Sequence, residues 1–234
     1  MPLIGMTTLR KDAPRNASFY VRMDFYDKAV IRAGGLPVSI PSFAEEELLD
    51  AYLENLHGVL FIGGPDIPPH FYTEDPPSPT LHTLEDPVAE SHLLLVKRCM
   101  AKKIPFFGIC LGMQESSVAN GGKMIQHLEE KTPVHSAEGI DTYHNVTLKK
   151  GSRLEKIFAQ EVIRVNSSHH QSLDQDHIPA NAQITAFSED GVPESLEFSG
   201  ELFQLGVQWH PERIDDEAHR MKLFSAFIDA CRKE

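Results

Sequence analysis

The chain has 234 residues, of which 41% are hydrophobic and 24% charged, and its formal net charge is −12. A chain of this length and composition can bury a sizeable core within one globular domain. The acidic balance argues against a nucleic-acid partner and against an anionic membrane surface.

The cysteine usage indicates the compartment. Cys99, Cys110 and Cys231 form an odd set without the spacing of a disulfide framework, which favours a reducing environment. The N-terminal residues do not follow the pattern of a signal peptide, and no stretch approaches the roughly 18 apolar residues of a membrane span. We therefore expect a single domain over residues 1–234, located in the cytoplasm.

The first half of the chain alternates between strands and helices. Apolar runs predict strands at Leu3–Thr7, Leu36–Ile40, Gly58–Ile62 and Ile104–Ile109. Helical spacing predicts helices at Phe19–Ala33, from an N-cap at Ser42 to Leu56, from Pro87 to Lys102, and at Leu111–Asn120. The polar segment Lys11–Ser18 is predicted to be a loop. The Gly- and Pro-rich segment Gly63–Pro87 is a longer loop, of the kind that is often functional.

The second half contains shorter strands and a closing helix. The strands are predicted at Val146–Leu148, Val162–Val165, Ile184–Phe187, Ser195–Phe198 and Leu205–Trp209, some of them antiparallel, and the helix at Asp215–Arg232. The opening strand–helix alternation predicts an α/β fold with right-handed crossovers, a mostly parallel sheet and helices on both faces. Sites in such sheets lie beyond the carboxyl ends of the strands.

Cys110 lies where the fourth predicted strand passes into a helix. Gly108 and Gly112 flank it, and Gly-x-Cys-x-Gly is typical of a nucleophile elbow, whose tight turn leaves little room for a Cβ. The N-terminus of the following helix favours the thiolate. We interpret Cys110 as a nucleophile, with a buried core cysteine as the alternative. Cys99 and Cys231 have no such surroundings.

A thiolate nucleophile needs a base and a group that orients the base. His210 follows the last predicted strand, and Glu212 stands two residues later across Pro211, so the two side chains can point the same way. This predicts His210 as base and later acid, with Glu212 fixing its tautomer. A polar strand end at the surface is the alternative, because the chain has 12 histidines.

Gly63 and Gly64 follow the third predicted strand and would let backbone N–H groups approach a carbonyl oxygen. Together with the N–H of Leu111 they could form an oxyanion hole, although such a pair can also be a simple tight turn.

The segment Ser167–Gln171 contains the adjacent residues His169 and His170. Neighbouring side chains on a strand point apart, and no CxxC, HxxxH or HExxH pattern accompanies the pair, so the sequence predicts no metal site. We interpret the segment as a loop that recognises the substrate.

Taken together, these segments resemble the class I glutamine amidotransferase superfamily over nearly the whole chain. The matching motifs are Gly-Ile-Cys-Leu-Gly-Met-Gln at 108–114 and Val-Gln-Trp-His-Pro-Glu at 207–212. Within the superfamily, Gly-Gly-Pro-Asp-Ile-Pro-Pro at 63–69 followed by Tyr72, and Val-Asn-Ser-Ser-His-His-Gln-Ser at 165–172, are similar to the γ-glutamyl hydrolase-like branch, peptidase family C26.

The resemblance implies a flavodoxin-like fold and cysteine-dependent hydrolysis of γ-glutamyl amide bonds, with no metal or organic cofactor. It matches a catalytic triad of Cys110, His210 and Glu212, and backbone oxyanion donors at Gly64 and Leu111. It matches Gln114, His169, His170 and Gln171 to groups that contact or border the substrate.

Two positions depart from this branch. Leu111 stands where Arg is common, and Asp86–Glu90 reads Asp-Pro-Val-Ala-Glu where Asp-Pro-x-Arg-Asp is usual. The leaving amine is therefore open. A glutaminase that delivers ammonia to a separate synthase, or a non-catalytic scaffold, is an alternative on the same fold. The expected partner is a small γ-glutamyl substrate, and the sequence leaves open a homodimer or a synthase subunit.

Overall fold

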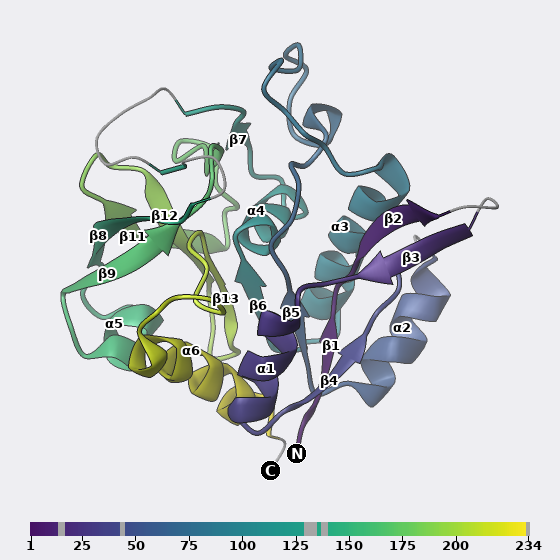
Figure 1. The fold of residues 1–234 in the computed structure, drawn as a ribbon, viewed down its shortest axis with the longest axis horizontal. Coiled ribbons are helices and arrows are strands. Elements are labelled where there is room, and N and C mark those ends of the chain that lie inside the picture. Colours follow the sequence, from purple (N-terminus) through teal and green to yellow (C-terminus); the bar gives the residue numbers. More distant parts are fainter. Residues whose placement is uncertain (14–16, 43–44, 129–134, 137–139, 233–234) are drawn as a thin grey trace.

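The computed structural model describes residues 1–13, 17–42, 45–128, 135–136 and 140–232. Its largest element is a nine-stranded sheet with the order β4-β1-β5-β6-β13-β12-β11-β8-β9 (Figure 1). In chain order these strands are β1 Leu3–Met6, β4 Leu36–Ser39, β5 Gly58–Phe61, β6 Phe106–Ile109, β8 Thr142–Leu148, β9 Val162–Ser167, β11 Ala182–Ser188, β12 Pro193–Phe198 and β13 Gln204–Val207.

The sheet has a parallel half and an antiparallel half. Strands β4, β1, β5, β6 and β13 run parallel to one another. Strands β12, β11, β8 and β9 continue the sheet with antiparallel pairings. The expected α/β fold built on a parallel sheet is confirmed, and the short strands of the second half extend it.

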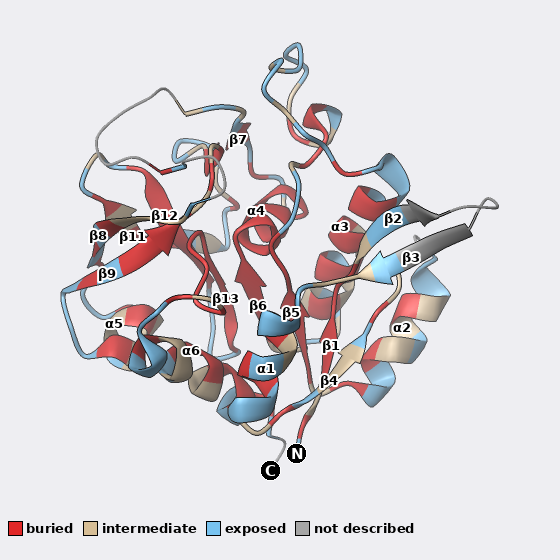
Figure 2. Cartoon of the chain, in the orientation of Figure 1, coloured by how far each residue is buried: buried red, intermediate tan, exposed pale blue. Residues whose placement is uncertain are grey.

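The central strands are buried on both faces, which explains their continuous apolar sequences. Successive side chains alternate between two cores: Phe107 packs in one core, and its neighbour Phe106 packs in the other. Figure 2 shows β5, β6 and the helix that follows β6 as buried. The residue that comes directly after β6 is Cys110, so it projects from the most deeply buried part of the sheet.

Helices cover both faces, as predicted. The helices α1 Asp24–Arg32, α5 Arg153–Phe158 and α6 Glu217–Ala230 contribute to the first core. The helices α2 Glu46–Asn55, α3 Asp86–Ala101 and α4 Leu111–Val118 contribute to the second. Among the described residues, no helix combines the length and the apolar character needed to cross a membrane.

The N-terminal region differs from the prediction. The described parts of the supposed loop Lys11–Ser18 are strands: they belong to the antiparallel pair β2 Leu9–Ala13 and β3 Ala17–Val21, and residues 14–16 lie outside the described part of the chain. The pair projects from the body of the molecule (Figure 1). The helix predicted from Phe19 begins only at Asp24, because Phe19-Tyr20-Val21 is an aromatic and β-branched run that fits a strand.

Four shorter elements were not predicted. They are the 3₁₀ turn η1 Pro69–Phe71, the small antiparallel pair β7 Met124–Ile125 with β10 Ser172–Leu173, and helix α5. Helix α5 carries a local signal, because the Ser152 hydroxyl accepts a hydrogen bond from the Glu155 N–H in a Ser-x-x-Glu sequence. The predicted N-cap at Ser42 is wrong: its hydroxyl donates to the Thr8 carbonyl.

Candidate active site

Cys110 sits in a strained turn between β6 and α4. Its φ of 51° and ψ of −104° lie in a region that side-chain-bearing residues rarely adopt. A Cβ on Gly108 would lie 2.6 Å from the Gly112 carbonyl carbon, and a Cβ on Gly112 would lie 2.4 Å from the Phe61 carbonyl oxygen. Both contacts are with backbone, so only glycine fits at either position. The structure therefore has the steric features of a nucleophile elbow.

His210 reaches Cys110 because their strands are neighbours. β13 pairs in parallel with β6, and the Cys110 N–H donates to the Val207 carbonyl at 2.8 Å, which aligns the two strand ends. His210 lies three residues beyond Val207, and Cys110 is close enough for its charge to raise the pKa of His210. Residues about one hundred positions apart in the sequence are thereby joined in one site.

Glu212 completes this arrangement on the other side of the ring. Its Oε1 lies 2.8 Å from Nδ1 of His210, and both side chains are buried. A carboxylate can only accept, so Nδ1 carries the proton and Nε2 is left for the sulfur. Burial lowers the pKa of His210, but the charges of Glu212 and Cys110 outweigh burial and raise this pKa to about 10. The ring is thus held as an imidazolium next to the sulfur.

Gly64 and Leu111 offer backbone donors next to the elbow. Within the described residues, neither N–H donates a hydrogen bond. The preceding N–H, that of Gly63, donates to the Tyr26 hydroxyl at 3.0 Å. A Cβ on Gly63 would come within 2.8 Å of His210 Cε1 and 2.9 Å of Tyr26 Oη, so glycine is required in this turn.

Tyr26 was not predicted as a site residue. It lies on α1, is fully buried, and anchors the Gly63–Gly64 turn through the hydrogen bond from Gly63. Burial, reinforced by the charge of Glu212, raises the pKa of Tyr26 well above its usual value, so the hydroxyl stays neutral. The sequence held no signal for it, because Tyr26 is simply one apolar position in a helical pattern.

Gln208 also escaped prediction, although it stands in the Val-Gln-Trp-His-Pro-Glu motif at 207–212. Its side-chain amide donates to Cys110 Sγ at 3.4 Å, and its oxygen accepts from the Gln114 amide at 3.2 Å. Gln114, matched to a substrate contact by resemblance, is therefore linked to the nucleophile through Gln208. Both glutamines are buried.

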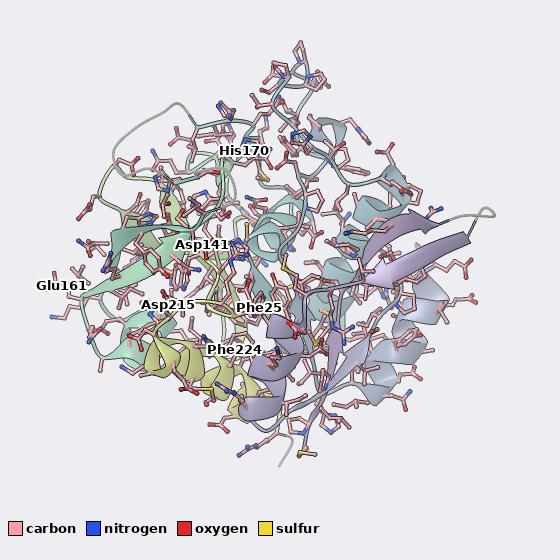
Figure 3. All side chains as sticks on the ribbon, viewed as in Figure 1. Phe25, Asp141, Glu161, His170, Asp215 and Phe224 are labelled. Atoms are coloured by element: carbon pink, nitrogen blue, oxygen red, sulfur yellow. The ribbon has the colours of Figure 1, made fainter. Side chains whose placement is uncertain are left out.

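The segment Ser167–Gln171, the histidine loop, divides into two parts. His170 Nε2 lies 3.1 Å from Asp66 Oδ1, and the Gln171 amide donates to the Gln126 carbonyl at 3.3 Å. These contacts join the loop to the long Gly-rich loop and to the segment after β7; Figure 3 labels His170 at the top of the view. His169 instead turns inward and is buried.

The other two thiols are unsuited to catalysis. Burial raises the pKa of Cys99 far above its ordinary value, and burial raises the pKa of Cys231 to about 12. Both belong to the hydrophobic cores.

Comparisons with known proteins agree with these features. The sequence model of the family peptidase C26 matches residues 2–212. A γ-glutamyl-γ-aminobutyrate hydrolase of Escherichia coli K12 is 31% identical over 246 residues, covering 99% of this chain and 94% of that protein. A putative glutamine amidotransferase of Mycobacterium tuberculosis is 30% identical over 238 residues, covering 98% of this chain and 75% of that protein.

Solved structures are similar in fold. The CTPS glutaminase domain of Trypanosoma brucei, with bound acivicin, aligns with a TM-score of 0.70 at 15% identity, covering 99% of this chain and 94% of that chain. A putative GMP synthase component from Thermoplasma acidophilum aligns with a TM-score of 0.65, also at 15% identity and with the same coverage. These two likenesses establish the architecture.

Proposed function

The chain belongs to the peptidase C26 family, and from this premise we propose that it hydrolyses γ-glutamyl amide bonds through a thioester on Cys110. The observation that carries the proposal is a buried imidazole that is hydrogen-bonded to Glu212 and lies at the strand end next to that of Cys110, whose charge raises its pKa. This is the arrangement of a thiol nucleophile, its proton shuttle and an orienting carboxylate.

The first half-reaction forms the thioester. The Cys110 sulfur attacks the γ-carbonyl carbon, and the carbonyl oxygen becomes an oxyanion held by the free N–H groups of Gly64 and Leu111. Each such donor lowers the barrier by roughly 3 kcal/mol. His210 gives its proton to the leaving nitrogen, the C–N bond breaks, and the free amine departs.

The second half-reaction releases glutamate. His210, now neutral, takes a proton from water, and the resulting hydroxide adds to the thioester carbon. Collapse of the second tetrahedral intermediate breaks the C–S bond and returns the proton to the Cys110–His210 pair. Glu212 keeps Nδ1 protonated throughout, so Nε2 stays directed at the reacting atoms. We place His170, Gln171 and Gln114 along the substrate, with His169 behind them.

The γ-glutamyl specificity is supported by the hydrolase relative, which covers nearly the whole chain. The glutaminase alternative is less well supported, because those structures share only 15% identity and speak for the fold alone. Leu111 is fully buried against Gly64 and Leu9, so its apolar side chain packs the elbow. Leu111, which stands where Arg is common in this branch, then does not select the leaving amine, and other residues do.

The state of the cysteines indicates the compartment in which the protein acts. All three cysteines are free, which supports a reducing compartment such as the cytoplasm. The partner that we assign is the small γ-glutamyl amide itself, and dependence on a synthase is an outcome of the test below.

A substrate screen tests the proposal. Purified protein is incubated with γ-glutamyl conjugates of several amines and with glutamine, and free glutamate is measured. We expect conjugates of larger amines to be cleaved by the protein alone, Cys110→Ala to be inactive, and the matched Cys99→Ala variant to retain activity. If glutamine is the only compound that is cleaved, and if its cleavage requires an added synthase, the protein is instead a glutaminase subunit.

A further inference from the structure

A buried carboxylate, Glu194 on β12, is surrounded by three imidazoles. Its Oε1 lies 3.0 Å from Nε2 of His144, 3.5 Å from Nδ1 of His135 and 3.5 Å from Nε2 of His169. At least nine-tenths of each of the four side chains is buried. The imidazoles come from separate parts of the chain: β8, the segment before it, and the loop after β9.

Two of the three imidazoles already use their outer nitrogen. His135 Nε2 lies 3.2 Å from both oxygens of Asp190, and His169 Nδ1 lies 3.0 Å from the Gln171 carbonyl oxygen. Both partners can only accept, so these outer nitrogens carry the protons. In a neutral imidazole the inner nitrogen then presents a lone pair, and here each lone pair faces the carboxylate oxygen of Glu194.

These inner atoms have no hydrogen-bond partner. Nδ1 of His135 and Nε2 of His169 are buried and unpaired among the described residues, as is Oε2 of Glu194. His144 differs, because its Nε2 is hydrogen-bonded to Oε1 of Glu194 at 3.0 Å and its buried Nδ1 is the unpaired atom. Lone pairs that converge in a dry interior repel one another unless a cation lies between them. A histidine that binds a metal donates its other N–H to a carboxylate or carbonyl in just this manner.

We propose that His135, His144 and Glu194 bind one divalent transition-metal ion, with zinc as the best match and with His169 bordering the site. One atom each of His135, His144 and Glu194 lies within 4.8 Å of the others. Neighbouring ligand atoms in a tetrahedral zinc site lie roughly 3.3 Å apart, close to the contacts around Oε1. The two charges of the ion balance those of Glu194 and Asp190.

The three ligands are buried and leave the fourth position of a tetrahedral zinc ion open. The Gln208 N–H donates to the Glu194 carbonyl at 2.9 Å, and the Gln208 side chain contacts Cys110 Sγ. The ion would therefore join β8 and the segment before it to β12, whose Glu194 carbonyl accepts from Gln208. The sequence pattern did not predict this site, because its ligands come from three separate segments.

The test is metal binding by the full-length protein. Chelator-treated protein is dialysed against Zn²⁺ or Co²⁺, and bound metal, visible absorption and the thermal midpoint are measured. We expect one equivalent of zinc per chain, the intense absorption of tetrahedral Co²⁺, and a raised midpoint. Glu194→Gln and His144→Asn should lose this equivalent, while His219→Asn, which alters a buried histidine on α6, should keep it.

Two results would overturn the proposal. One is wild-type protein that takes up less than half an equivalent of zinc after excess metal is removed, which would mean that protonated imidazoles hold Glu194. The other is equal zinc uptake by wild type and both site variants, which would place the metal elsewhere. Because wild-type uptake decides the first case, the test does not depend on the folding of a variant or on catalytic activity.

Discussion

Glu212→Gln is the most informative change in the proposed catalytic triad. It preserves the shape of the side chain and removes the charge 2.8 Å from His210 Nδ1. The pKa of His210 stands at about 10 against an ordinary 6.5, which favours the imidazolium by roughly 5 kcal/mol. Without Glu212, only the charge of Cys110 acts against the effect of burial, so we expect the pKa of His210 to fall by about 1–3.

The assay is the pH dependence of kcat/KM with a chromogenic γ-glutamyl anilide. Loss of the imidazolium sets the basic limb, so we expect this limb near pH 10 in the wild type and at clearly lower pH in Glu212→Gln. We also expect kcat to fall about 10²-fold or more, because the amide no longer fixes the tautomer. Asp215→Asn, a charge change in the same segment, serves as the control. An unmoved basic limb in Glu212→Gln would refute the reasoning.

Three further changes test the surrounding structure. Tyr26→Phe leaves the buried Gly63 N–H without an acceptor, so kcat should fall about tenfold with little change in KM; an unchanged kcat would exclude a positioning role. Gly112→Ala places a Cβ 2.4 Å from a backbone oxygen and should lower the thermal midpoint far more than Gly151→Ala, whose Cβ meets nothing within 4 Å and whose only cost is its φ of 82°; similar midpoints would contradict the steric account. Burial lowers the pKa of His219 to about 4. Urea titrations should therefore show that the free energy of unfolding falls by up to about 3 kcal/mol from pH 6.5 to pH 4 in the wild type but not in His219→Asn. Parallel losses in the two proteins would argue against this effect of His219.

The positions of the candidate nucleophile and of the two residues proposed to assist it could be predicted from the sequence because their signals are local. Gly108 and Gly112 report a turn in which a Cβ clashes with backbone, and the apolar runs before Cys110 and His210 place both residues at strand ends. Parallel strands bring such ends to one edge of the sheet, so separation along the chain did not hide the pairing.

The parts that were missed depend on contacts between distant segments. Tyr26 serves the site through the packing of α1 against a glycine turn, and the cluster around Glu194 requires the register of two antiparallel strands and a loop. Neither leaves a periodic mark in the sequence. The β2–β3 pair was mistaken for a loop and part of a helix, because Arg10-Lys11-Asp12 is polar and shows no alternation.

The central claim is that the sulfur of Cys110 carries the γ-glutamyl group during turnover. The most direct measurement is mass spectrometry of peptides from protein that has been quenched with acid during turnover of a γ-glutamyl conjugate. We expect a mass increase of one γ-glutamyl group on the peptide that contains Cys110, and none in Cys110→Ala. A γ-glutamyl group on Cys99 or Cys231, or turnover that persists in Cys110→Ala, would contradict the account.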